Sequence, residues 1–323
     1  MAHHGKRGQG WRHRNVWTTY RPNAKIRYKN IERLHPMSEA DFWAVLEECQ
    51  GAGMKPPTSL AECFSALYYG TFPRKSVIAR LRGKSWGGWE AAFSRGNYPG
   101  RTWLYDLNKA YRWSACEGLP DMRTAFAVLD DPWDRARYGV YCVLLDDAAL
   151  PYIRSQYPVW ITSEELSRVR TRPLCYYGGV GFRKMVDLRA AFTELDRRFP
   201  TATGRVSRAF WGMWNATTGP EQVSWKRGEK SRELPNPFYN PIWALVVTSR
   251  IKLRLMEYQP TMLHCFVDSM LSTVEVPTGE APGEWKLVGT HDAPWIKAPG
   301  HWGDRTGPVK QSGVRRTAPG GVA

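Results

Sequence analysis

Two aspartates that follow apolar runs are the first candidates for chemistry in this chain of 323 residues. Asp106 ends the segment Arg101–Asp106, R-T-W-L-Y-D, and Asp268 lies within Leu263–Val274, L-H-C-F-V-D-S-M-L-S-T-V. Two carboxylates that converge from separate strands can hold a pair of Mg²⁺ or Mn²⁺ ions, which stabilise the attacking and leaving oxygens in phosphoryl transfer. We therefore expect two-metal chemistry if the fold joins these residues across 162 positions, 268 minus 106.

The segments that carry these aspartates have the patterns of strands. Arg101–Asp106 and Val140–Leu145 are apolar runs typical of buried strands. Leu263–Val274 is apolar on both sides of a short polar pair, which predicts a hairpin with Asp268 near its turn. Ser38–Cys49 has a capping serine and an apolar stripe at helical spacing. The changing periodicity favours a mixed α and β domain over a helical bundle or a β-sandwich.

The composition indicates a folded protein with an anionic partner. Hydrophobic residues make up 42% of the chain, which is enough for a core and excludes disorder throughout. The 46 Lys and Arg against 30 Asp and Glu give a net charge of +16, so we expect an anionic polymer or surface as partner. Between Met1 and Arg33, nine basic residues accompany a single acid and alternate with aromatics. That composition suits nucleic-acid binding, and it also suits a solvated flexible arm.

The cysteines and the apolar runs bear on metal binding and location. Six cysteines are scattered without a C-x-x-C pair or a Cys/His cluster at zinc spacing, which argues against structural zinc and is typical of a reduced, intracellular protein. The N-terminus has no apolar signal region, and runs such as Ile242–Val247 are far too short to span a membrane. We also interpret His264 as a core histidine and Gly178–Gly179 as a turn.

The residues around Asp106 carry a resemblance to a known family. Trp103–Tyr111, W-L-Y-D-L-N-K-A-Y, resembles the first polymerase motif of family-B DNA polymerases, particularly the protein-primed type of phages and linear plasmids, whose pattern is Y-D-x-N-S-L-Y-P. Val159–Leu166 is similar to W-x-x-S-E-E-L, and His264–Ser269 falls on Y-C-D-T-D-S. Further segments that resemble the family, in the family's order, are Ala91–Arg101, Phe210–Gly219, Asn240–Arg250 and Glu284–Lys297.

The resemblance implies a role for each matching residue. Asp106 and Asp268 would ligate two Mg²⁺ or Mn²⁺ ions, and Tyr111 would be the steric gate beneath the deoxyribose. Arg205 and Arg208 precede Asn215 at helical spacing and would supply phosphate-binding charge, because the family's fingers lysine falls on Trp211. The first Asp of the D-T-D motif is Phe266, and the late K-x-Y motif reads Pro299-Gly300-His301. The nucleotide-binding residues implied are Tyr111, Leu107, Asn108, Arg205, Arg208 and Asn215, and the DNA-binding residues expected are Lys6, Arg7, Arg12, Arg14, Lys25, Lys29 and Lys297.

The resemblance also implies an α+β architecture, a polymerase palm of antiparallel sheet backed by helices, with helical fingers and basic arms at both ends. We therefore expect neither an exonuclease domain nor a usual thumb within these 323 residues. The expected divisions are a basic arm (1–36), a helical N-terminal segment (37–95), a first palm segment with the first polymerase motif (96–165), fingers (166–219), a second palm segment with the Asp268 hairpin (220–297) and a basic Gly/Pro-rich tail (298–323).

Three functions fit these observations. The first is a minimal DNA-directed DNA polymerase that adds deoxynucleotides to a primer 3′-hydroxyl. The second is a catalytically weakened pseudo-polymerase that binds DNA structurally in replication or packaging, and the third is a primase-like initiator. The expected partners are primer-template DNA, deoxynucleoside triphosphates and a replication or terminal-protein partner, with no membrane. The expected location is the cytoplasm, of a bacterial host if a phage encodes the chain.

Overall fold

The computed structural model describes residues 88–129, 131, 133, 138–146, 149–153, 157–198, 214 and 240–311. The expected helix at 38–49 and the basic arm at 1–36 lie outside these residues, as do Arg205, Arg208 and Asn215. The expectations for these residues therefore stay predictions. The described part is a mixed α+β structure of antiparallel sheets with few helices, which confirms the predicted fold class.

A five-stranded antiparallel sheet, the central sheet, holds both aspartates. Its order is β1-β10-β11-β3-β12. The predicted strand at Arg101–Asp106 is confirmed as β3, and the predicted hairpin is confirmed as β10 and β11 with Asp268 in its turn. The strands are β1 (Trp89–Ala92), β3 (Arg101–Leu107), β10 (Met262–Val267), β11 (Ser269–Ser272) and β12 (Trp285–Asp292).

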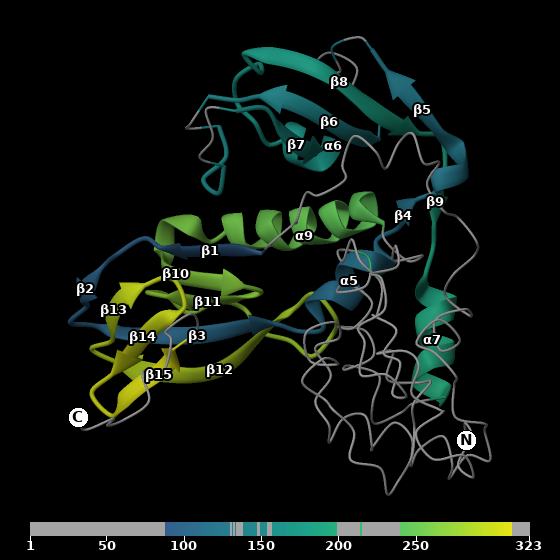
Figure 1. Cartoon of the computed structure of the whole chain (residues 1–323). Helices are drawn as coiled ribbons and strands as arrows, with labels where there is room; N and C mark the ends of the chain where they lie inside the picture. Colours follow the sequence, from purple (N-terminus) through teal and green to yellow (C-terminus); the bar gives the residue numbers. More distant parts are fainter. Residues whose placement is uncertain are drawn as a thin grey trace, which may run out of the picture.

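Helix α9 (Pro241–Met256) lies between the central sheet and a second sheet above it (Figure 1). Its side chains are apolar around most of its circumference, and they are buried at every position from Pro241 to Ile251. A helix that is apolar all round needs cover on all sides, and the two sheets supply it. The helix begins at Asn240, whose side chain accepts a hydrogen bond from the Trp243 N–H at 3.2 Å, with Pro241 in the first helical position.

The sheet above α9, the upper sheet, has the order β5-β8-β6-β7. The predicted strand at 140–145 is confirmed as β6. The expected turn at Gly178–Gly179 is wrong, because both glycines lie inside β8. Gly178 has a φ of 111° and lies next to the point where the register between β8 and β6 shifts. The glycine pair therefore forms part of a β-bulge. The strands are β5 (Ala125–Val128), β6 (Gly139–Leu144), β7 (Val159–Thr162) and β8 (Cys175–Phe182), with α6 (Ser163–Leu166) after β7.

A third sheet, the C-terminal sheet, has the order β15-β14-β13-β2 and corrects the expected tail at 298–323. Two strands, β14 and β15, occupy this region up to Gln311, and Trp302 of β14 is 1% exposed and packs with Leu263 and Leu271 of the central sheet. The Gly300 N–H donates to His264 Nε2 at 2.8 Å, so His264 is the buried core histidine expected. The strands are β2 (Gly96–Asn97), β13 (Trp295–Ala298), β14 (His301–Asp304) and β15 (Gly307–Gln311).

Two of the expected divisions do not coincide with structural ones. The end of the helical segment at 37–95 is not helical, since 89–92 is strand β1 and pairs with β10. The boundary expected at 166 separates β7 from β8, yet both belong to the upper sheet. The remaining elements are α5 (Ala110–Cys116), β4 (Leu119–Pro120), a 3-10 turn at Met122–Thr124, β9 (Met185–Val186), α7 (Arg189–Arg198) and a 3-10 turn at Gln259–Thr261.

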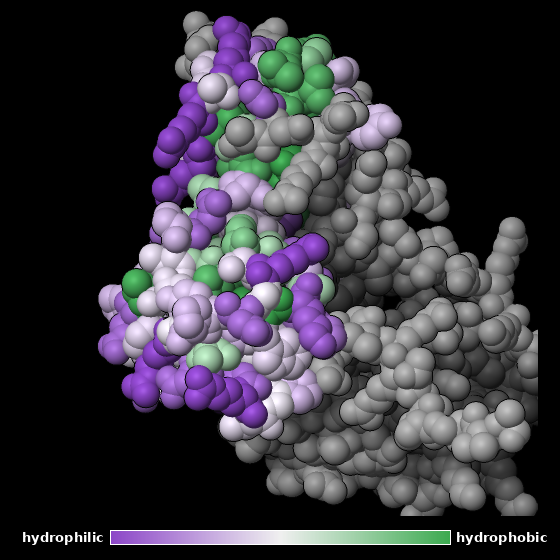
Figure 2. Space-filling model, turned by 90° about the vertical axis from the view of Figure 1, so that its left-hand side faces the viewer, coloured by the Kyte–Doolittle hydropathy of each residue, from purple (hydrophilic) through white to green (hydrophobic). Residues whose placement is uncertain are grey.

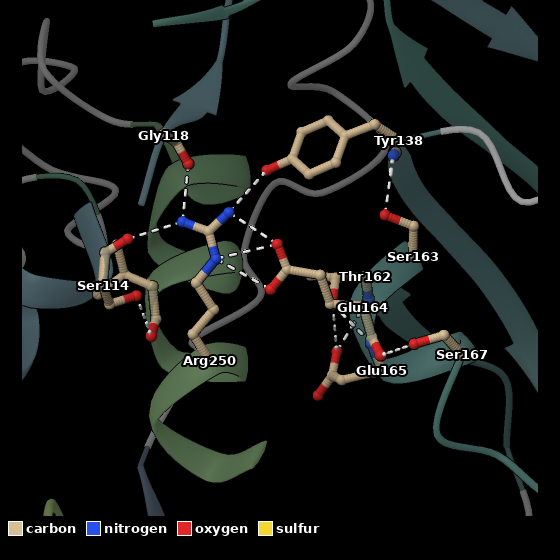
Figure 3. A network of polar contacts seen from close by, with 11 residues as sticks. Ser114, Gly118, Tyr138, Thr162, Ser163, Glu164, Glu165, Ser167 and Arg250 are labelled. Atoms are coloured by element: carbon tan, nitrogen blue, oxygen red, sulfur yellow. Dashed lines mark hydrogen bonds and ion pairs between the residues drawn. The ribbon is translucent and has the colours of Figure 1, made fainter. Parts of the chain in front are cut away.

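Arg250 of α9 joins three helices through a buried polar network (Figure 3). Its Nε and Nη2 donate to the Glu164 carboxylate of α6, with contacts of 2.7 to 3.0 Å. Its Nη1 donates at 2.7 Å to the carbonyl oxygens of Ser114 and Gly118, at the end of α5, and Nη2 donates to the Tyr138 hydroxyl at 3.4 Å. All five guanidinium hydrogens thus have acceptors within reach, which is the condition for burying a charge.

Burial and pairing act in opposite directions on Arg250. Burial works to lower the pKa of the guanidinium, but the hydrogen bonds and charge of Glu164 outweigh it and hold the pKa above its ordinary value. Burial also raises the pKa of the Tyr138 hydroxyl, so this group stays neutral. The network therefore holds one fixed ion pair between α9 and α6, and hydrogen bonds from the same arginine hold the end of α5.

Part of the upper sheet region exposes apolar side chains. In Figure 2, the largest group of hydrophobic residues on this face lies on the upper part of the molecule, beside a strip of hydrophilic residues. Leu129, Tyr157 and Leu174 of the upper sheet region are 79%, 77% and 68% exposed. No helix in the described ranges is long and apolar enough to cross a membrane.

Replacing Glu164 by Gln should destabilise the protein by about 3 kcal/mol, because Arg250, with a side chain only 8% exposed, would lose its counter-charge. Urea unfolding measures the change. Asp292→Asn is the matched control, since it breaks the Arg101–Asp292 pair whose side chains are 62% and 66% exposed, and it should cost less than about 1 kcal/mol. Equal losses in the two variants would contradict a structural role for the buried pair.

Acid should weaken the contact between the central and C-terminal sheets through Asp304. Hydrogen bonds from Thr306 and from His291 Nδ1, the latter at 2.6 Å, lower the Asp304 pKa to about 2. The folded pKa lies below the unfolded value of about 3.9, so this stabilisation is present above about pH 4 and disappears as the pH falls towards 2. Unfolding measured from pH 5 to pH 2 should show the parent losing its advantage over Asp304→Asn in that window. A difference that stays constant with pH would rule this linkage out.

Candidate active site

Asp106 and Asp268 lie side by side at one end of the central sheet. Asp106 of β3 is directly opposite Ser269 of β11, and Asp268 is the residue before Ser269. The Leu107 N–H donates to the Asp268 carbonyl oxygen at 2.8 Å, which fixes the two backbones against each other. Opposed Cα atoms of an antiparallel pair are about 4.5–5.5 Å apart, so residues from distant parts of the chain become immediate neighbours here. Both aspartates are half-buried.

A strained turn presents Asp268. The Asp268 N–H donates to the Phe266 carbonyl oxygen at 2.9 Å, and Val267 between them has a φ of 64°. This is a γ-turn with its central residue in the left-handed region, where a β-branched side chain is a genuine outlier. Gly88 makes room for it, because a Cβ there would lie 2.8 Å from the Val267 Cα. Strain of about 1–3 kcal/mol of this kind persists only where the surroundings enforce it, and it clusters at functional sites.

The Asp106 side chain faces away from α9. Its neighbours Tyr105 and Leu107 are 2% and 1% exposed and pack in the core with α9, and side chains alternate along a strand. The residues opposite Asp106 on the same face are Ser269 of β11 and Lys286 of β12. Farther along this face, the C-terminal sheet covers Leu104 and Leu271, as the shared cluster with Ile296 and Trp302 shows. The aspartates therefore lie on the part of the face beyond that cover.

Asn108 fixes the loop that leads into β12. Its side-chain amide donates to the carbonyl oxygens of Glu280 and Ala281, the latter at 3.3 Å. Its main-chain N–H donates to the Glu284 carbonyl oxygen and its own carbonyl oxygen accepts from the Gly283 N–H, both at 2.8 Å. The structure therefore gives Asn108 a positioning role, and its expected nucleotide contact stays a prediction.

Tyr111 lies in the first turn of α5, five positions after Asp106 in the chain. The helix begins at Lys109, which has a φ of 49° and turns the chain sharply out of β3. Tyr111 is half-buried and packs against the core, so its position relative to Asp106 is fixed. Arg112 beside it forms a bidentate ion pair with Asp196 of α7, with contacts of 2.7 and 2.6 Å. One short turn thus links the first aspartate to an immobilised aromatic ring.

The remaining expected residues lie elsewhere or outside the described ranges. The Leu107 side chain is in the core, so only its main chain can meet a ligand. Lys297 is exposed on β13, with its ammonium 5.0 Å from the centre of the Trp295 ring. The residues outside the described ranges are Arg205, Arg208, Asn215, Lys6, Arg7, Arg12, Arg14, Lys25 and Lys29.

The donor chemistry of the aspartate pair fits Mg²⁺ or Mn²⁺. Within the described ranges no group of three or more His, Cys, Asp and Glu side chains could hold a metal ion. A pair of half-buried carboxylates does not form a complete cage, but Mg²⁺ is commonly bound by one or two carboxylates together with waters and substrate phosphates. Asp106 and Asp268 are therefore suited to an ion that arrives with a phosphorylated substrate.

Sequence reasoning missed two features of this site. The left-handed turn at Val267 carries no local signal, because glycine or asparagine is the residue expected there. The position of Lys286 opposite Asp106 depends on strand register, which a single sequence does not specify. The apolar runs on each side of Asp268 did signal the hairpin itself.

Comparisons with known proteins show what this fold resembles. No protein-family model and no curated protein matches the sequence. A solved structure of phi29 DNA polymerase complexed with primer-template DNA matches with a TM-score of 0.61 at 14% identity, over 81% of this chain and 57% of that chain. The polymerase complexed with single-stranded DNA gives 0.61 at 13% identity, over 84% and 60%, and its ternary complex with incoming nucleotides gives 0.58 at 13%, over 82% and 60%.

The chain spans 57% to 60% of the length of the polymerase chains that it matches. Identity of 13% to 14% supports a statement about fold alone. The chain has a polymerase-like α+β fold, with the two aspartates next to each other on its central antiparallel sheet.

Proposed function

We propose that this protein is a DNA-directed DNA polymerase of the family-B, protein-primed type, which adds deoxynucleotides to a primer 3′-hydroxyl. The observation that carries the proposal is the adjacency of Asp106 and Asp268 on paired strands. The polymerase-like fold supports the same conclusion.

The carboxylates of Asp106 and Asp268 would hold two Mg²⁺ or Mn²⁺ ions. When bound, such ions stabilise the negative charge that develops on the attacking and leaving oxygens of an in-line displacement. The contribution of the chain is to hold both carboxylates in place before substrate arrives. The hydrogen bond from Leu107 to Asp268 and the enforced turn at Val267 provide that preorganisation, which lowers the reorganisation needed during reaction.

Tyr111 would exclude ribonucleotides. Its ring is fixed against the core one turn after Asp106, so a sugar placed for reaction at the aspartates would lie against it. A 2′-hydroxyl on that sugar would clash with the ring. The DNA itself would be held by the basic arms and by Lys297, through non-specific phosphate contacts.

A second function is supported by one specific observation. Phe266 of β10 is directly opposite Ser269 of β11. The resemblance expects the first acid of the D-T-D motif at the position of Phe266. A half-buried aromatic ring there cannot replace a carboxylate as a ligand. We therefore keep a catalytically weakened DNA-binding pseudo-polymerase as the alternative, and primer extension distinguishes the two.

The parent protein should extend a primed template with Mg²⁺ or Mn²⁺, and Asp106→Asn and Asp268→Asn should each reduce the rate by at least about 10³-fold, because each removes a charge that cannot be replaced at the site. Gel analysis of labelled primer measures the rate. Asp292→Asn, an exposed acid at the far end of β12, is the matched control and should retain activity. DNA binding without extension by the parent would favour the pseudo-polymerase.

Tyr111→Val should raise the ratio of ribonucleotide to deoxynucleotide incorporation by about tenfold or more, because it removes the ring that would contact the 2′-hydroxyl. Tyr111→Phe keeps the ring and should discriminate as the parent does. Single-nucleotide incorporation with each triphosphate measures the ratio. If the Val variant discriminates as well as the parent, Tyr111 is not the gate.

A further inference from the structure

One row of side chains crosses the central sheet through the aspartate site. Each member is directly opposite the next in strand register, so all share the face that turns away from α9. The row begins with an exposed acid on β1 and ends with an exposed base on β12. In strand order its members are Glu90, Phe266, Ser269, Asp106 and Lys286.

Lys286 is the member of this row closest to Asp106 on the side away from Asp268. Adjacent strands are about 4.8 Å apart, so the base of the Lys286 side chain is one strand spacing from Asp106, while Glu90 is three spacings away. A lysine side chain is long enough to bring its ammonium in front of a neighbouring strand. Trp285, the residue before Lys286, is 1% exposed in the core, which fixes this part of β12.

The side chain of Lys286 is exposed, and none of the ion pairs formed among the described residues involves its ammonium. Other exposed cations of these sheets differ in this respect, since Arg101 is paired with Asp292 and Lys297 lies over the Trp295 ring. A cation that pairs with no described acid and lies beside two carboxylates is suited to an anion that enters with its own divalent cations.

We propose that Lys286 binds a phosphate group of the substrate next to Asp106. The inference rests on the proposed function, because that function requires a phosphorylated substrate at the aspartates. The proposal gives Lys286 of β12 a phosphate-binding role that the sequence analysis expected of Arg205 and Arg208. The phosphate belongs either to the incoming triphosphate or to the last phosphodiester of the primer, and both present the same oxygens to the ammonium.

Lys286→Ala in the full chain tests the proposal, with Lys286→Arg as the charge-conserving variant. Lys184→Ala is the matched control, because Lys184 is an exposed lysine between β8 and β9, away from the central sheet. One arm measures the Kd for primer-template DNA by fluorescence anisotropy without nucleotide. The other arm measures the Kd for a deoxynucleoside triphosphate with Mg²⁺ by calorimetry, without DNA.

We expect Lys286→Ala to weaken binding about tenfold in one arm, as for loss of one charged hydrogen bond, with Lys286→Arg restoring most of it and Lys184→Ala unchanged. Loss in the nucleotide arm identifies the triphosphate. Loss in the DNA arm, with a salt dependence reduced by about one phosphate contact, identifies the primer. The variant should unfold at the same urea concentration as the parent, since the side chain is exposed.

Unchanged affinity in both arms overturns the proposal and leaves Lys286 as a solubilising charge on an edge strand. A parent that binds neither ligand overturns it as well. A parent that binds a ligand through Lys286 but does not extend primers contradicts the proposed polymerase activity, while the phosphate contact stands. The two failures are therefore distinguishable.

Discussion

The pairing of β3 with β11 is the interaction on which the rest of the site depends. It brings Asp106 beside Asp268, and the hydrogen bond from the Leu107 N–H to the Asp268 carbonyl oxygen sets their relative position along the strands. A slip of one residue in this register would turn Asp106 towards α9, where a carboxylate has no place among the buried apolar residues. The same register that buries Tyr105 and Leu107 therefore presents the acids.

The core next to this pairing explains why the register is well specified. Helix α9 is buried between two sheets, so a shift of the central sheet would expose apolar surface of that sheet and of α9. Arg250 adds a directional constraint, because its hydrogen bonds to Glu164, Ser114 and Gly118 have a fixed geometry. Helix α5, which carries Tyr111, is held at its far end by that arginine, and at its beginning the chain leaves β3 through the left-handed backbone of Lys109.

Features encoded by nearby residues could be predicted from the sequence, and features set by distant partners could not. The β10–β11 hairpin has its signal in a dozen consecutive residues, and it was predicted. The glycines of β8 looked like a turn, because a bulge is defined only by the partner strand β6. The residues after 298 looked like a tail, because their Gly/Pro content is local whereas the burial of Trp302 depends on the central sheet. The loop contacts of Asn108 could not be predicted, because its partners lie 172 and 173 positions away, and its expected nucleotide contact stays a prediction.

The same distinction clarifies what the departures from the family pattern mean. A missing motif residue removes a function only if no nearby side chain provides the same charge or ligand. Strand register decides which side chains are near. Phe266 has an acid opposite it, Glu90 of β1, but that residue is three strand spacings from Asp106, one farther than the position it would have to replace. The phosphate-binding charge is different, because Lys286 is directly opposite Asp106 on β12. The site therefore combines one departure that the sheet does not compensate, at Phe266, with one for which Lys286 is placed to compensate, as the proposed phosphate contact requires.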